Sequence, residues 1–443
     1  MAALRTSELL AALSVALDLT EGQRAGHAVR TCYLAMRLAD RLVLPAAARS
    51  SLYYAALLKD SGCSSNAAAV SELFGTADQQ LKERQATAGR SLLAMAWFSV
   101  RNLPAEPLPR RTRRLIHLAL SGQRERRDVE QLRCSRGAGI ARKIGFGQDV
   151  SEAIMTLHEH WDGGGLPQGL RRERIPLASR MIAVCAGLDV FCTDRGPASA
   201  MGVIQRRRGS WYDPVLTDHL LELCRGGVLD DLQAPDLKAL VFAMEPRESV
   251  QVATDTDIDL IAGAFADIID AKSPYTGRPS QNVASIAHGL ATRLGLQDSD
   301  RLDVRRAALL HDIGKLGVPN IILDKPGPLD AAEFAIIKQH PALSLRILEP
   351  IGAFSRVAQI AASHHEKLDG TGYFRGLDAE TLGISARIVS VADVFEAMTA
   401  DRPYRAPMPP EVALSLMRKS AGEHLAADVI AALDDSRALP KAA

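Results

Sequence analysis

Residues 308–315 read ALLHDIGK, in which an adjacent His–Asp pair follows an apolar run. The apolar approach to His311 and Asp312 indicates that the pair is buried. A buried carboxylate needs a partner such as a cation, because an isolated charge is costly to remove from water. A second segment, IAASHH at 360–365, carries two adjacent histidines after a similar apolar run. Both segments predict buried polar side chains in the C-terminal half of the chain.

Six side chains of this half are candidate metal ligands. Imidazole nitrogens combined with carboxylate oxygens suit Fe, Mn, Ni or Zn, and one carboxylate can bridge two ions about 3.5–4 Å apart. The alternative is that each histidine caps a helix or makes a core hydrogen bond, and we apply it to His288 and His424. The six candidate ligands are His311, Asp312, His340, His364, His365 and Asp393.

The ALLHDIGK segment has a counterpart in the first half of the chain, ALLKDSGC at 56–63. A shift of 252 residues aligns the two segments and places Lys59 opposite His311. A shift of 207 residues then aligns HEHWDGGGLPQGL at 158–170 with HEKLDGTGYFRGL at 365–377. A repeat of about 200 residues indicates two whole domains rather than short stacked repeats.

The two shifts differ, so the first half carries about 45 extra residues, which we place between 64 and 130. We predict one domain at 1–225, a linker at 226–252 and a second domain at 253–443. A chain of 443 residues has ample length for two buried cores.

Apolar residues recur at spacings of three and four along several segments, which is typical of amphipathic helices. Clear examples are 7–17, 283–296, 331–349 and 410–420. Gly and Pro separate these runs, and no convincing alternating strand series is present. We therefore predict an all-α fold made of two tandem helical bundles.

Charge is divided unevenly between the halves. Residues 1–225 carry 31 Lys and Arg against 22 Asp and Glu, whereas 226–443 carry 22 against 30. The arginine clusters at 110–114 and 124–127 are interpreted as a solvated helix face or docking surface, because no aromatic ladder or nucleic-acid motif accompanies them. Nucleic acid is therefore not an expected partner.

The cysteines and the N-terminus favour a cytoplasmic protein without a membrane partner. All six cysteines lie in the first half, without a C-x-x-C pair, and we expect them to be reduced and buried. The first 19 residues are interrupted by charged residues and do not resemble a signal peptide. No uncharged apolar run approaches 18 residues, so no membrane span is expected.

The segment HHEKLDGTGYFRGL, with HDIGK before it and VADVFEAMTADRPYR after it, resembles an HD-GYP domain, a subgroup of the HD superfamily of metal-dependent phosphohydrolases. The likeness covers about 258–435. It implies an all-helical fold with two divalent metal ions, Fe or Mn first and Ni or Zn as alternatives. It also implies hydrolysis of cyclic di-GMP to the linear dinucleotide or to GMP. The first half then reads as a degenerate HD-like domain with a structural, sensory or binding role.

The resemblance assigns roles to individual residues. Asp312 would bridge the two ions, with His311 and Asp393 on the first ion and His340, His364 and His365 on the second. Lys315 would contact a phosphate and, with Asp312, serve catalysis. The remaining substrate-binding residues would be Tyr373, Arg402 and Arg405, since a guanidinium can hold a phosphate through two hydrogen bonds. Glu366 and Asp369 would orient the histidines and the loop.

The chain departs from the family pattern at two places in the second half. Pro279 stands where the family has a further histidine ligand, 32 residues before His311, and the Gly-Tyr-Pro signature reads Gly-Tyr-Phe at 372–374. Losing a ligand would weaken the binding of the first metal ion.

The first half departs more widely. It keeps His27, Asp60 and His158, but Lys59 replaces the HD histidine and Arg133 falls opposite His340. The other mismatches are Leu157 opposite His364 and Ala186 opposite Asp393. Two cations in place of two histidines oppose a divalent metal ion, so we predict that this half is not catalytic.

Three hypotheses remain open from the sequence. The first is a metal-dependent phosphodiesterase acting on cyclic di-GMP. The second is a catalytically impaired protein that binds a cyclic dinucleotide and signals through a protein partner or a dimer, which Pro279 favours. The third is an HD phosphohydrolase acting on another nucleotide.

Overall fold

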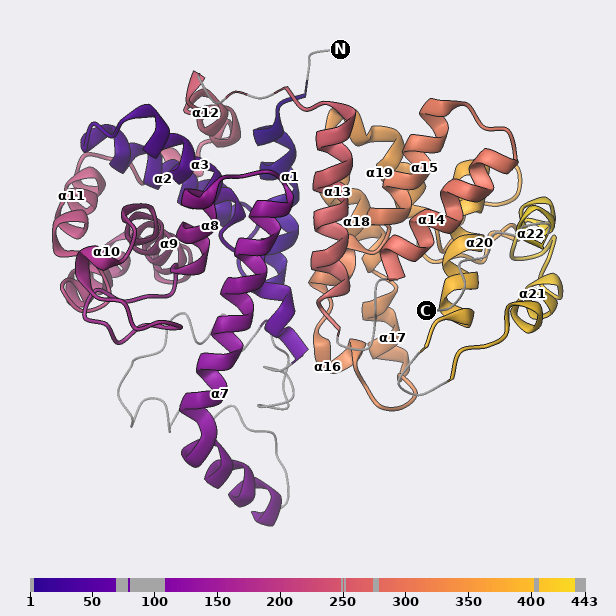
Figure 1. Ribbon diagram of the computed structural model, residues 1–443, viewed down its shortest axis with the longest axis horizontal. Helices are drawn as coiled ribbons and strands as arrows, with labels where there is room; N and C mark the ends of the chain where they lie inside the picture. The colour runs from indigo at the N-terminus through magenta and orange to yellow at the C-terminus, as the bar shows by residue number, and fades with distance from the viewer. Residues whose placement is uncertain are drawn as a thin grey trace. The chain divides into compact units, whose positions relative to one another are not determined.

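The computed structural model describes residues 4–68, 79, 108–247, 250, 252–273, 279–401 and 406–434, with side chains from 124 onward in the long helix that begins at 108. These residues are helical or irregular, and none of them lies in a β-strand. The chain divides into two compact units. Unit 1 is Met1–Thr254 with Pro319–Ile321, and unit 2 is Asp255–Val318 with Ile322–Ala443 (Figure 1).

Unit 1 contains helices of very different lengths. They are α1 (Thr6–Thr20), α2 (His27–Arg41), α3 (Ala46–Leu58), α7 (Leu108–Lys143), α8 (Gln148–Met155), α9 (Leu177–Arg195), α10 (Pro197–Arg207), α11 (Pro214–Arg225) and α12 (Leu237–Ala243), with 3₁₀ turns at Cys63–Asn66, Arg172–Arg174 and Asp231–Gln233. Helix α2 is central, because it contacts α1, α3, α9, α11 and α12. It is accordingly apolar on most of its circumference, and Leu34, Met36 and Leu38 are fully buried.

Unit 2 is built around two helices, α15 and α14, and the shift of 252 residues places α14 opposite α2. Its helices are α13 (Asp255–Asp270), α14 (Pro279–Arg293), α15 (Asp298–Leu310), α16 (Asn320–Leu323), α17 (Ala331–Ile337), α18 (His340–Leu348), α19 (Ser355–Ala362), α20 (Ile384–Thr399), α21 (Pro410–Arg418) and α22 (Ala427–Asp434), with 3₁₀ turns at Ile313–Gly317 and Gly352–Phe354. Helix α15 packs against α13, α14, α19 and α20 (Figure 1). Leu309 and Leu310 are almost fully buried, and each such side chain contributes roughly 1.5–3 kcal/mol of hydrophobic stabilisation.

The all-α prediction is confirmed in the described residues, and the predicted helices at 7–17, 283–296 and 410–420 correspond to α1, α14 and α21. The single helix predicted at 331–349 is wrong, because the structure divides it into α17 and α18. Pro341 explains the break: it lies in the first turn of α18, and proline cannot donate the hydrogen bond that would continue α17.

Four further predictions concern the linker, the insertion, the cysteines and membrane-spanning helices. Residues 226–252, expected to link the halves, contain α12, which packs against α2 and groups with unit 1. The predicted insertion at 64–130 lies largely outside the described residues. The six cysteines form no disulfide, and five of them are buried. Among the described residues, no helix combines the length and apolar character needed to cross a bilayer.

The same glycine contact occurs in both units. A Cβ atom added to Gly62 would lie 1.9 Å from the backbone oxygen of Arg133, and one added to Gly314 would lie 2.0 Å from that of His340. In unit 2 the contact is reinforced by Ser344, whose hydroxyl accepts from Gly314 N (3.0 Å). The contact therefore brings Arg133 and His340 to equivalent places, in agreement with their alignment in sequence.

We predict that Gly314→Ala destabilises the protein by about 1–3 kcal/mol, because the added methyl group overlaps backbone that cannot move away as a side chain could. The matched control is Gly289→Ala within α14, where an added Cβ meets nothing within 4 Å. That change should stabilise the helix by up to about 1 kcal/mol. Denaturant unfolding measures both, and equal stability of the two variants would contradict the contact.

Candidate metal centre

Four segments of unit 2 meet at one buried polar cluster. His311 caps the C-terminal end of α15 and Asp312 follows it. His340 begins α18, the pair 364–365 follows α19, and Asp393 lies within α20. His311, His340 and His364 are each at most 1% exposed. The fold thus brings together the six side chains that the sequence singled out.

Three of these histidines are oriented by the same backbone contact. In each, ring Nδ1 faces the carbonyl oxygen of the residue three positions earlier in the chain. The pairs are His311 with Ala308 (2.7 Å), His340 with Ile337 (2.7 Å) and His364 with Ala361 (2.6 Å). A carbonyl can only accept, so Nδ1 must carry the hydrogen. The Nε2 atom of each neutral ring then carries the free lone pair, as in a metal-binding histidine.

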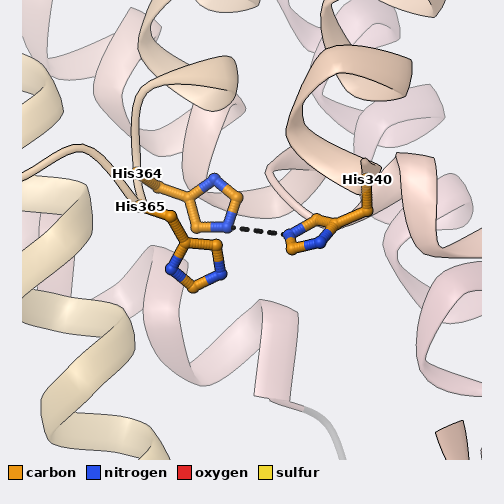
Figure 2. Close-up of side chains that lie close together, drawn as sticks. All are labelled: His340, His364 and His365. Atoms are coloured by element: carbon orange, nitrogen blue, oxygen red, sulfur yellow. Dashed lines mark hydrogen bonds between the residues drawn. The ribbon is translucent and has the colours of Figure 1, made fainter. Parts of the chain in front are cut away.

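Those lone pairs converge. The Nε2 atoms of His340 and His364 lie 3.2 Å apart (Figure 2), and two neutral acceptors at this distance repel unless a proton or a cation lies between them. Asp312 Oδ1 is 3.3 Å from His340 Nε2 and 3.8 Å from His364 Nε2. This oxygen is buried and has no hydrogen-bond partner within the described part of the chain. The donor set therefore fits a metal ion.

The other oxygen of Asp312 faces a different group of side chains. Oδ2 lies 3.3 Å from His311 Nε2 and accepts a hydrogen bond from Lys315 Nζ at 2.5 Å. His311 Nε2 is in turn 3.6 Å from Asp393 Oδ1. One carboxylate therefore presents its two oxygens to two sets of nitrogen and oxygen atoms, which is the arrangement needed to bridge two ions.

His365 completes the histidine group. Its ring centre is 4.0 Å from that of His364 and 5.1 Å from that of His340 (Figure 2), and ligand atoms of the three residues lie within 4.8 Å of one another. Burial, reinforced by the neighbouring histidines, places the pKa of His364 well below its usual value, and burial lowers the pKa of His365 to about 4. Both rings are thus neutral near pH 7 and able to donate lone pairs.

The charges beside Asp312 favour its ionised form. Burial alone would raise the pKa of this carboxyl, but His311 and Lys315 hold it well below the usual range. Burial likewise opposes the charged form of His311, yet Asp312 and Asp393 raise the pKa of that ring. A metal ion at this position would replace the proton that His311 otherwise holds between the two carboxylates.

An aromatic surface adjoins the histidine group. The Tyr373 ring lies 4.5 Å from that of His365 and 6.1 Å, nearly perpendicular, from that of Phe334. Lys338 Nζ lies over both aromatic rings, 4.9 Å from the centre of Phe334 and 5.4 Å from that of Tyr373. Phe334 is 40% exposed. The sequence analysis named Tyr373 but not Phe334 or Lys338. The feature that points to these two residues is an aromatic side chain on α17, a helix with no buried residue.

The loop that carries Tyr373 is held by Glu366. Its carboxylate accepts hydrogen bonds from the backbone nitrogens of Phe374 (3.4 Å), Arg375 (2.9 Å) and Leu377 (3.2 Å). Unit 1 repeats this arrangement: Glu159 accepts from the nitrogens of Gln168 (2.6 Å), Gly169 (3.1 Å) and Leu170 (2.9 Å). Asp369 instead accepts from Thr371 and lies 3.4 Å from His424. The predicted substrate ligands Arg402 and Arg405 lie outside the described residues.

The sequence profile of the HD domain matches residues 108–216 and 263–429. The chain belongs to the HD domain family. A 3'3'-cGAMP-specific phosphodiesterase 3 from Vibrio cholerae is 40% identical over 96% of this chain and 93% of its own length. A cyclic di-GMP phosphodiesterase from Thermotoga maritima is 38% identical over 38% of this chain and 47% of its own length. The crystal structure of the V. cholerae cyclic GMP-AMP-specific phosphodiesterase V-cGAP3 aligns with a TM-score of 0.67 at 36% identity, covering 98% of this chain and 97% of that one.

The sequence analysis expected a further histidine at position 279, where this chain has proline. Pro279 is the first residue of α14 and offers no ligand atom. One turn away, Asn282 donates to the buried carboxylate of Glu396 (3.3 Å). In unit 1 the equivalent His27 remains, but its Nδ1 is 2.6 Å from Asp189 Oδ2.

In unit 1, cationic side chains occupy positions equivalent to those of two histidines in the unit 2 cluster. Lys59 forms an ion pair with Asp60. Arg133 pairs with Glu21 (2.9 Å) and lies 3.5 Å from the other oxygen of Asp60. Lys59 is only 5% exposed. These buried ion pairs supply the positive charge that a carboxylate at the HD position requires.

We predict that Mn²⁺ or Fe²⁺ added to chelator-treated protein raises its thermal stability, since an ion bound only by the folded state stabilises by about 2.7 kcal/mol at 100 times its dissociation constant. His340→Ala should abolish most of this shift, because it removes a nitrogen that faces both His364 and Asp312. The control is His288→Ala on α14, outside the cluster. Equal metal-dependent shifts in the two variants would contradict the assignment of His340.

Proposed function

We propose that this chain is a metal-dependent phosphodiesterase that hydrolyses a cyclic dinucleotide. As an HD-family phosphodiesterase, it would carry its active site in unit 2. The observation that carries the proposal is the convergence of the His340 and His364 lone pairs on the unpartnered Oδ1 of Asp312. This arrangement is poor for protein stability alone and well suited to divalent cations.

We assign His311, Asp312 and Asp393 to one ion, and His340, His364 and His365 with Asp312 to a second, with Fe or Mn favoured and Ni or Zn as alternatives. When bound, the ions supply Lewis acidity that activates water and neutralises charge on the phosphoryl oxygens. Asp312 would hold the reacting centre by presenting one oxygen to each set of ligands. Lys315, which donates to Asp312 Oδ2 and is partly exposed, would present its positive charge to a phosphate.

Substrate recognition would use the aromatic surface beside this cluster. Phe334 and Tyr373 offer two ring faces for a purine, and Lys338 adds positive charge between them. Arg402 and Arg405 are proposed to hold phosphate or guanine. The relative that spans nearly the whole chain is named for 3'3'-cGAMP, so we favour this dinucleotide. Cyclic di-GMP, for which a shorter match is named, is the alternative substrate; the product would be linear or a mononucleotide.

We infer that the chain is a tandem duplication of HD-type bundles. The first, 1–225, would be a degenerate domain with a structural, sensory or binding role, and 253–443 would be the catalytic domain. The repeated glycine contact and the repeated glutamate in the loop support this reading. Pro279 favours a second candidate function, a cyclic-dinucleotide effector with weak turnover that acts through a protein partner or dimer.

We predict that Asp312→Asn lowers turnover of 3'3'-cGAMP by at least about 100-fold, because changes even behind the metal ligands cost 10–100-fold. Turnover is measured by chromatography of products from protein purified anaerobically and loaded with Mn²⁺ or Fe²⁺. Asp298→Asn is the control, since Asp298 is exposed at the start of α15, the helix that precedes Asp312. Metal-loaded wild type that binds 3'3'-cGAMP or cyclic di-GMP without cleaving either would instead establish the effector.

We predict that Phe334→Ala raises KM for the dinucleotide by about 5–150-fold with little change in kcat, because stacking worth about 1–3 kcal/mol holds substrate and transition state alike. Ile336→Ala is the control, since Ile336 is also exposed on α17 but is not part of the aromatic pair. An equal KM in both variants would exclude Phe334 from the substrate site.

A further inference from the structure

Unit 1 contains a group of potential metal ligands that the HD pattern does not predict. Glu130 and Cys134 are four residues apart on α7 and so lie on the same face of that helix. His158 follows α8, which packs against α7. One ligand atom from each residue lies within 4.8 Å of the others. A carboxylate, a thiol and an imidazole therefore face one another across two helices.

One carboxylate oxygen of this group lacks a hydrogen bond. Glu130 Oε2 is buried and has no hydrogen bond within the described residues, and no ion pair of Glu130 occurs there. Cys134 is 2% exposed. A carboxylate oxygen buried without a hydrogen bond is costly, so a cation bound at this oxygen would be favourable.

The surrounding cations are already balanced. Lys59 pairs with Asp60, and Arg133 is shared between Glu21 and Asp60. These two cations face three carboxylates, because Arg133 also interacts with Glu130, which leaves one negative charge in excess. One divalent cation together with one thiolate would bring the cluster of charges to neutrality.

The sequence repeat relates this group to the histidine cluster of unit 2. His158 is the counterpart of His365 in the shift of 207 residues, and Arg133 is that of His340. In unit 2 the rings of His340 and His365 lie 5.1 Å apart. In unit 1 the guanidinium of Arg133 turns to Glu21 and Asp60, and its sequence neighbour Cys134 lies near His158 instead.

We propose that unit 1 binds one Zn²⁺ ion through Glu130 Oε, Cys134 Sγ and His158, with water in the fourth position. Zinc accepts this mixture of sulfur, nitrogen and oxygen, and bond lengths of about 2.0–2.3 Å place tetrahedral ligands about 3.3–3.6 Å apart, so small rotamer changes would close the site. Binding converts the thiol to a zinc-bound thiolate and releases its proton to solvent. Burial raises the pKa of Cys134 to about 12, so without metal the thiol keeps that proton.

Cobalt(II) provides a test that does not depend on catalysis. The ligands assigned in unit 2 include no sulfur, so a thiolate-to-cobalt charge-transfer band in the near ultraviolet reports on unit 1 alone. Full-length protein is stripped with chelator and titrated anaerobically with Co²⁺, and Zn²⁺ is then added to displace it. We expect one equivalent of cobalt to produce the band and one equivalent of zinc to remove it.

Three variants locate the site. Cys134→Ser should abolish the band, and Glu130→Gln should weaken Co²⁺ binding at least about 10-fold. Cys63→Ser is the matched control: Cys63 is buried in the same unit but its Sγ faces Asp60 (3.6 Å), so the band should remain. Absence of the band in wild type, its survival in Cys134→Ser, or unchanged affinity in Glu130→Gln would overturn the proposal. Because Glu130→Gln removes only a charge, it keeps the test decisive if Cys134→Ser fails to fold.

Discussion

The site depends on one hydrogen bond made three times, from a histidine Nδ1 to the carbonyl three residues earlier. This bond fixes which ring nitrogen carries hydrogen and also fixes the direction of the ring, because the carbonyl belongs to the last turn of the preceding helix or segment. The ends of α15, α17 and α19 therefore decide where the Nε2 lone pairs point. The unfavourable meeting of those lone pairs around Asp312 is then a consequence of helix ends packed close together, and we propose that bound cations relieve it.

Sequence reasoning recovered the all-α class and the side chains of the unit 2 cluster, because adjacent polar pairs after apolar runs are strong signals of buried chemistry. It missed the break between α17 and α18, since helical periodicity continues through 331–349 although Pro341 interrupts the backbone. It also missed Phe334 and Lys338, because their contacts with Tyr373 depend on how that break turns the chain. Glu130 was missed for a related reason: only folding shows that one of its carboxylate oxygens is buried without a hydrogen bond.

Comparison of the two units shows which features of the fold are kept where histidines of the unit 2 cluster are replaced. The tight glycine contact is kept in both, and so is the packing of two central helices, α2 with α3 in unit 1 and α14 with α15 in unit 2. At the HD position itself, the histidine of unit 2 is replaced by Lys59, whose ammonium pairs directly with the adjacent carboxylate. A carboxylate at this place has positive charge beside it in either unit, from Lys59 in unit 1 and from Lys315 in unit 2, where we propose that metal ions add to it.

In each unit one glutamate accepts hydrogen bonds from several backbone nitrogens. This contact has a consequence for how such proteins diverge. Glu159 and Glu366 anchor their loops at both ends, whether or not imidazoles surround them. The residues between these anchor points can then be exchanged without disturbing the helices beneath. If this loop contacts the nucleotide as we propose, mutations that change the choice of base should accumulate in this short span, and new nucleotides can be adopted while the helices stay unchanged.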